Sequence, residues 1–195
     1  MNTLLNLAKA IDGNYASGIA KCIQLVNGTE RFDSDILFQN YLQHWMYKYD
    51  SALHVVAAGH NAEGVQSLLK LGLSVNDKKN RRMATPLHYA ADAVVDAQTY
   101  SEERQRDTLV QLLKGEADID AADKNGATPI MRAVRCRAIV AVDILMRYGA
   151  DLTIKNNKGS NLMKLAMVGS GRGGSGSVIA KANQAKIILL LKGRI

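Results

Sequence analysis

The glycine- and serine-rich run at residues 169–177 is the segment of this chain best suited to bind an anion. Gly169, Gly171 and Gly174 have the spacing G-x-G-x-x-G, and a helical pattern follows them. Backbone N–H groups at the start of such a helix can bind phosphate. A dinucleotide site also needs a preceding strand in a βαβ unit, and a P-loop needs a lysine. Neither is present, so we interpret the run as a flexible loop, with an anion nest as the alternative.

Histidine and cysteine side chains provide no arrangement typical of catalysis or of metal binding. His54 and His60 have no cysteine or carboxylate at ligand spacing. Cys22 and Cys136 are isolated on apolar helical patterns, which is typical of reduced core residues. No serine, cysteine or carboxylate pair is spaced to act with a base. We therefore expect no enzyme, no metal site and no cofactor.

The charge of the chain is unevenly distributed. Residues 1–150 carry 17 basic and 17 acidic side chains, whereas residues 151–195 carry 8 basic side chains and only Asp151, so the net charge of +7 arises there. A field of this kind attracts an acidic surface or phosphates. Nucleic-acid binding through residues 151–195 is therefore an alternative, but no aromatic side chains are interleaved with the basic ones. A solvated polar face explains the same charge.

The N-terminal segment and the apolar runs bear on localisation. Residues 1–7 lack the basic region and the long apolar stretch of a signal peptide. The best apolar run, residues 138–146, is short and contains Asp143, whereas a membrane helix needs about 20 apolar residues. We expect a cytoplasmic, monomeric protein without membrane contact.

A repeated motif indicates the architecture. Thr85-Pro86-Leu87-His88 is followed by Thr128-Pro129-Ile130-Met131, and these two segments contain the only prolines of the chain. Ser51-Ala52-Leu53-His54 is a weaker copy that begins 34 residues before Thr85. Residues 159–166 continue the register, because Gly159 stands 33 residues after Gly126. Threonine favours the position before a helix, and proline in the first turn loses no hydrogen bond. Repeats at this period indicate a solenoid of stacked helical units.

The second half of the unit recurs as well, as residues 68–76, 112–120 and 145–152. Together these segments resemble the ankyrin-repeat family over about residues 46–168. The resemblance implies an all-α ankyrin-repeat solenoid of about four to five helix-pair repeats, with finger-like hairpins and atypical terminal repeats. It also implies that His54 and His88 form hydrogen bonds between neighbouring fingers. Proteins of this family bind partners with their fingers and first helices.

The register predicts one domain over residues 1–195. Its expected parts are a degenerate capping repeat at 1–30, an aromatic-rich inserted helix at 31–49, and repeats at 50–78, 79–122, 123–155 and 156–195. The helix at 31–49 holds six of the ten aromatic residues of the chain, which suit either an interface or a closed end of the stack.

Two departures from the repeat pattern lie in the second and last units. About ten extra residues separate Ala91 from Leu112, which predicts a longer loop and added helical turns. Thr99 and Glu102 have capping-box spacing there. Glu116 occupies the usual glycine position, so we expect that helix end to differ. The glycine run falls where the loop between the two helices of the last repeat is expected.

Several basic and aromatic residues occupy finger and first-helix positions in this register. Arginine pairs with carboxylates in a bidentate manner, and complementary charge speeds association. We therefore predict an adaptor or inhibitor that binds an acidic surface of a protein partner; solvated finger tips are the alternative. The predicted partner-binding residues are Tyr47, Tyr49, Arg81, Arg82, Tyr89, Lys124, Arg132, Arg135 and Lys158.

Overall fold

The computed structural model describes residues 50–70, 72–95, 97–98, 100–168 and 177–194, which form eight helices and no strand. Three predictions lie outside the described residues: the capping repeat at 1–30, the aromatic-rich helix at 31–49, and the partner contacts of Tyr47 and Tyr49.

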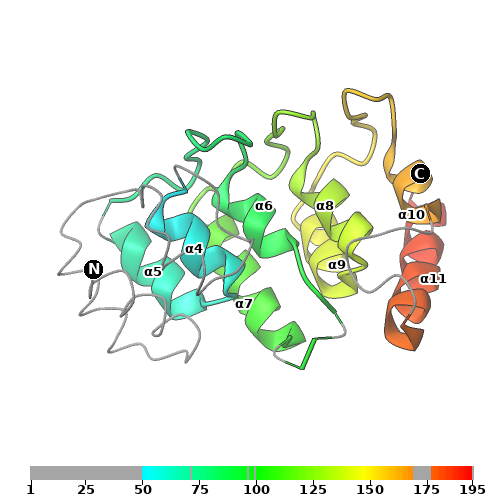
Figure 1. The fold of residues 1–195 in the computed structure, drawn as a ribbon, viewed down its shortest axis with the longest axis horizontal. Coiled ribbons are helices and arrows are strands. Elements are labelled where there is room, and N and C mark those ends of the chain that lie inside the picture. Colours follow the sequence, from blue (N-terminus) through cyan, green and yellow to red (C-terminus); the bar gives the residue numbers. More distant parts are fainter. Residues whose placement is uncertain (1–49, 71, 96, 99, 169–176, 195) are drawn as a thin grey trace.

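The eight helices form four antiparallel pairs that stack along one axis (Figure 1). Each first helix contacts the first helix of the next pair, and each second helix contacts the next second helix. The described part is therefore an all-α solenoid, as predicted. The pairs are α4 (Ala52–Ala58) with α5 (Ala62–Lys70), α6 (Pro86–Ala91) with α7 (Glu102–Lys114), α8 (Pro129–Cys136) with α9 (Ile139–Arg147), and α10 (Leu162–Met167) with α11 (Val178–Lys192).

The first helices start at equivalent residues and bury equivalent side chains. Their N-caps have extended backbone conformations and are Ser51, Thr85, Thr128 and Asn161. Five residues after each N-cap stands a small or β-branched side chain with no more than 3% exposure, namely Val56, Ala90, Ala133 and Ala166. Small side chains at this position let successive layers pack closely, so one continuous core runs through the stack.

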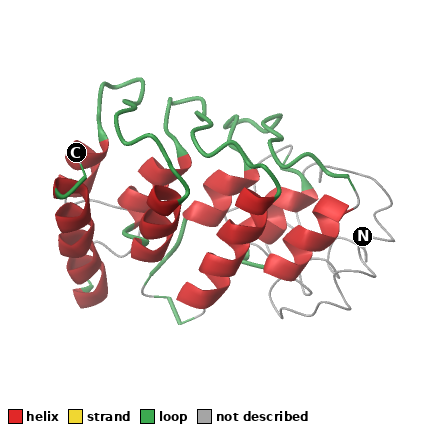
Figure 2. Ribbon diagram, turned by 180° about the vertical axis from the view of Figure 1, so that it is seen from behind, coloured by secondary structure: helices red, strands yellow, loops and turns green. Residues whose placement is uncertain are grey.

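The loops that lead from one pair to the next project from a single edge of the stack (Figure 2). We call these loops fingers, and residues 78–82, 122–126 and 155–159 their tips. Backbone hydrogen bonds join adjacent tips, from Lys124 N to Arg82 O at 2.9 Å and from Asn157 N to Asn125 O at 3.0 Å. The fingers therefore form a continuous row rather than independent loops.

One side chain in each tip stabilises the turn of its own finger. The side-chain oxygen of Asp123 accepts the backbone N–H groups of Asn125 at 2.8 Å and Ala127 at 3.1 Å. Asn80 and Asn156 accept the equivalent pairs of N–H groups in the neighbouring fingers. Such side-chain turns restrict the backbone locally, so the tips are preorganised.

The insertion in the second repeat forms a longer loop and a longer helix, as predicted. Helix α7 has 13 residues, against nine in each of α5 and α9. The predicted cap is wrong by two residues, because Ser101 is the N-cap and its hydroxyl accepts the Arg104 N–H. The Arg104 guanidinium also donates to the backbone oxygens of Gly59 at 2.7 Å and His60 at 3.3 Å. These bonds attach the added turn to the preceding repeat.

The glycine-rich run lies between α10, which ends at Met167, and α11, which begins at Val178. This is the predicted position, between the two helices of the last pair. Residues 169–176 are outside the described part of the chain.

The helix end at Glu116 does not differ from its equivalents, contrary to the prediction. Glu116 has a φ of 64°, in the same left-handed region as Gly72 at 85° and Gly149 at 90°. The surrounding structure therefore imposes this conformation even where a side chain opposes it. Asn76 helps to hold this conformation, because its side-chain amide donates to the backbone oxygen of Glu116 at 3.2 Å.

We expect Glu116→Gly to stabilise the protein. Relief of the left-handed strain exceeds the added backbone entropy of glycine, so the free energy of unfolding should rise by about 0.5–1 kcal/mol. Urea unfolding measures this change, and Gly149→Glu, the reverse exchange at the next repeat, should lower stability by a similar amount. A loss of stability in Glu116→Gly would contradict the strain argument.

Candidate protein-interaction site

Buried imidazoles join successive layers next to the fingers. His54 Nε2 lies 2.8 Å from the oxygen of Ala84, and His88 Nε2 lies 2.9 Å from that of Ala127, each in the following finger. The two carbonyls require Nε2–H tautomers. Nδ1 of His88 accepts the Thr85 N–H at 3.1 Å, so one ring connects its own helix start to the next finger. The family role expected of both histidines is confirmed.

His88 remains uncharged in the folded protein. It has no exposed surface, and burial together with the nearby Arg132 guanidinium lowers its pKa to about 3. A neutral imidazole donates with one nitrogen and accepts with the other, as this position requires.

The third repeat lacks this imidazole. Met131 occupies the equivalent slot and is 1% exposed. The hydroxyl of Thr128, which would face the ring, is buried and has no hydrogen-bond partner. At the position of this side chain, the boundary between the third and fourth pairs is therefore apolar. The two preceding boundaries have a histidine hydrogen bond at the same position.

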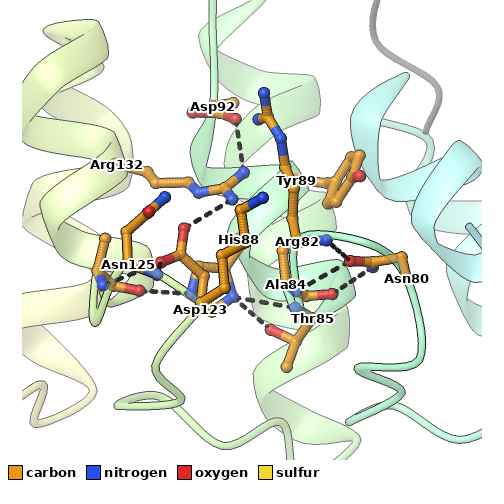
Figure 3. Close-up of polar contacts among 12 residues, drawn as sticks. Asn80, Arg82, Ala84, Thr85, His88, Tyr89, Asp92, Asp123, Asn125 and Arg132 are labelled. Atoms are coloured by element: carbon orange, nitrogen blue, oxygen red, sulfur yellow. Dashed lines mark hydrogen bonds and ion pairs between the residues drawn. The ribbon is translucent and has the colours of Figure 1, made fainter. Parts of the chain in front are cut away.

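Arg132 forms the centre of a buried ionic cluster on the finger side of the stack (Figure 3). Its guanidinium donates to Asp92 and to Asp123, each at 3.0 Å, and only 8% of its side chain is exposed. The guanidinium carbon also lies 5.8 Å from the centroid of the Tyr89 ring. Burial alone would raise the pKa of Asp123, but the N–H groups of Ala127 and Asn125 and the Arg132 guanidinium hold it below its ordinary value.

Tyr89 also points inward. Its hydroxyl donates to the carboxylate of Asp50 at 2.8 Å, and its ring meets His54 edge-on at a centroid distance of 5.2 Å. Burial and the adjacent carboxylate raise the pKa of the phenol above its ordinary value. Tyr89 and Arg132 were predicted to contact the partner, but the structure places them in the interior, with 4% and 7% exposure.

The other predicted contact residues that the structure describes lie at the surface. Arg81, Lys124 and Lys158 are exposed in consecutive tips, and Arg82 is half-buried beside them. Arg135 is also exposed, but it lies on α8 and is not part of a finger tip. The structure thus brings four of the predicted residues into one row.

The charged side chains that the tips present outward are all basic. The three tips contain seven basic residues and a single acidic one, Asp123, which is 8% exposed and paired with Arg132. Three further members of this row were not predicted, although the same register reaches them: Lys78, Lys79 and Lys155.

Acidic residues of the fingers are found at the bases instead, beside the ends of the second helices. Asp118, Asp120 and Asp151 lie there, and Asp120 accepts the Asp151 N–H at 3.0 Å. The fingers are therefore electrostatically divided, with basic tips and acidic bases.

No group of three metal-ligating side chains gathers among the described residues. Cys136 is buried, and burial together with Asp92 raises the pKa of its thiol to about 12, which disfavours the reactive thiolate. None of the described helices has both the length and the apolarity to cross a bilayer.

We expect Met131→His to stabilise the third layer boundary. The new ring would accept from the Thr128 backbone or hydroxyl and donate to the next finger, adding a net contribution of about 0.5–1.5 kcal/mol. Urea unfolding near neutral pH measures the gain, and Met131→Gln, which is similar in size, serves as the control. Equal stabilities for the histidine and glutamine variants would show that the ring geometry is unimportant.

The comparisons with known proteins agree with this geometry. A family model described as "Ankyrin repeats (many copies)" matches residues 112–166, and one described as "Ankyrin repeat" matches residues 84–124. The chain is 30% identical over 115 residues to the human "SH3 and multiple ankyrin repeat domains protein 2", a match covering 59% of the chain and 6% of that protein. It is 37% identical over 84 residues to "Alpha-latrotoxin-Lg1a" of Latrodectus geometricus, covering 43% and 5%.

The chain therefore spans only a small fraction of the length of these relatives. What it shares with them is the repeat itself, seen here as stacked helix pairs joined by buried imidazoles and by a row of fingers. Residues 84–166 of this chain are therefore ankyrin repeats, and such repeats generally mediate protein–protein interaction.

Proposed function

We propose that this chain is a non-catalytic adaptor or inhibitor whose finger tips bind an acidic surface of a protein partner. The observation that carries the proposal is the charge of the tips, where Asp123 is the one acid and its carboxylate is already paired with Arg132. An approaching partner therefore meets positive charge along the whole row.

Arginine and lysine supply different parts of this interaction. Arg81 is exposed, and its planar guanidinium can bind a carboxylate with two parallel hydrogen bonds. Lys124 and Lys158 present point charges that speed the encounter without imposing a geometry. Repetition of cations along three fingers favours an extended acidic surface over a single carboxylate.

The rigidity of the tips supports recognition of a folded partner. Asp123 holds its turn through two backbone N–H groups and holds Arg132 through its second carboxylate oxygen. Arg132 and Tyr89 thus help to position the row from inside rather than touch the partner. A preorganised surface loses less conformational entropy on binding than a mobile one.

The proposal predicts that reversing the tip charges abolishes partner capture. Immobilised wild-type protein and the variant Arg81→Glu/Lys124→Glu/Lys158→Glu would be incubated with nuclease-treated cell extract, and retained proteins quantified by mass spectrometry. The main wild-type ligands should be acidic proteins, eluted by added salt, and their retention should fall about tenfold or more in the variant, equivalent to about 1.4 kcal/mol.

Lys70→Glu/Arg106→Glu/Lys114→Glu is the matched control, because it makes the same charge change on exposed positions of α5 and α7. Its far-UV circular dichroism and its retained proteins should resemble those of the wild type. Unchanged retention in the tip variant, or equal losses in both variants, would overturn the proposal. Wild-type retention that disappears on nuclease treatment would instead assign the basic charge to nucleic acid.

A further inference from the structure

The last helix pair exposes an apolar surface that the other pairs do not. Helix α11 contacts α9 and α10, and no other described element covers its opposite side. Of the eight large apolar side chains that are exposed among the described residues, six belong to this pair or directly follow α10: Met167, Val168, Val178, Ile179, Leu189 and Leu190. Exposed apolar side chains are therefore concentrated in this pair rather than scattered over the described part of the chain.

Helix α11 is apolar on two opposite faces. Ala180, Ile187 and Leu191, with Asn183, form the buried face toward the stack. At 100° per residue the opposite face contains Val178, Ala182, Ala185 and Leu189. All four are exposed, with Val178 at 84% and Leu189 at 73%. This sequence pattern is typical of an interior helix of a solenoid, whereas a terminal helix needs a polar outer face.

The interior layers show which kind of structure covers such a face. Helix α9 is packed between α7 and α11, and its Val140, Ala141, Val142, Ile144 and Leu145 are all buried. In this stack, a second helix is thus covered on its far side by another helix. The exposed face of α11 therefore fits a helical occupant.

Charge determines which helical occupant fits best. Lys181 and Lys192 flank the exposed face on one side, and Lys186 flanks it on the other, all three exposed. No acidic residue follows Asp151 in the sequence. A second copy of the chain would bring two sets of cations together, which is unfavourable, whereas acidic side chains beside an apolar stripe would pair with them.

We propose that the outer face of α11 is a second docking surface, which binds an amphipathic helix of a partner protein whose apolar stripe is flanked by Asp and Glu. Val178 and Leu189 provide its apolar contacts, and Lys181 and Lys186 select for acidic flanks. The surface is separate from the finger tips and does not depend on their proposed role.

A designed peptide tests this proposal. The probe is a fluorescein-labelled amphipathic helix about as long as α11, with a leucine stripe flanked by glutamates, titrated with the full chain and followed by anisotropy. Binding should weaken about tenfold or more in Val178→Ser/Leu189→Ser, and to a similar extent in Lys181→Glu/Lys186→Glu. The same peptide with lysine flanks should bind about tenfold more weakly to the wild type.

Matched controls remove equivalent groups elsewhere. Met83→Ser/Tyr148→Ser deletes two other exposed apolar side chains, and Lys70→Glu/Lys114→Glu reverses two other exposed charges. Both should bind the acidic peptide as the wild type does, and so should the triple finger-tip variant, which separates this test from that of the proposed function. Equal affinity for both peptides, or wild-type affinity in Val178→Ser/Leu189→Ser, would overturn the proposal.

Two further measurements assign other occupants. Sedimentation of the wild type as a dimer that Val178→Ser/Leu189→Ser dissociates would show that a second copy covers the face. Co-sedimentation with vesicles of equal parts phosphatidylcholine and phosphatidylserine, lost in the same variant, would show a membrane-binding face. Either result would overturn the proposed partner helix. A monomeric protein that does not bind the vesicles would support the proposed partner helix.

Discussion

A buried, neutral imidazole that reaches from one helix pair to the backbone of the next finger is the interaction on which the stack depends. A single pair is too thin to bury its own apolar side chains, so each layer is stable only against its neighbours. His88 fixes the distance between two layers because it accepts from Thr85 and donates to Ala127 at the same time. The apolar columns beside it then meet in one core.

The same region links the interior to the surface charge. Arg132 forms ion pairs with Asp92 and Asp123 inside, and Asp123 in turn shapes the tip that carries Lys124. Burying three charged groups is costly, and an apolar replacement of equal volume can be equally stable. The ionic cluster affects the surface charge rather than the stability. It keeps the one acid of the tips away from the outer surface and leaves a uniformly basic row.

Much of the fold could be predicted because its local signals repeat. The two Thr-Pro pairs mark helix starts whose physical cause is local, and both occur where expected, at Thr85 and Thr128. Predictions that depended on tertiary context did worse. Glu116 adopts the left-handed conformation because its neighbours require it, and residue type alone suggested otherwise.

The residues of the candidate site likewise include some that the repeat register predicts and some that depend on tertiary contacts. The register placed Arg81, Arg82, Lys124 and Lys158 in fingers, which the structure joins into a row. Register cannot show that the side chains of Tyr89 and Arg132 turn inward, since their partners Asp50 and Asp92 come from other repeats. Periodicity likewise cannot decide which of the two apolar faces of α11 packs against the stack.

The pH dependence of unfolding tests the imidazole bridge most directly. Burial lowers the pKa of His88 to about 3 in the folded chain, from an unfolded value of 6.5. Between these values the unfolded state binds the proton and the folded state does not, so the stabilisation is complete above the unfolded pKa and is lost as the pH falls toward the folded one.

Urea unfolding from about pH 7 to about pH 4.5 should therefore show a slope that is shallower in His88→Gln by as much as about 1.4 kcal/mol per pH unit. Glutamine is similar in size and polarity but does not titrate, and the shifted pKa values of His60 and Asp123 contribute to both curves. Parallel curves for the two proteins would contradict a buried, neutral His88 between the layers.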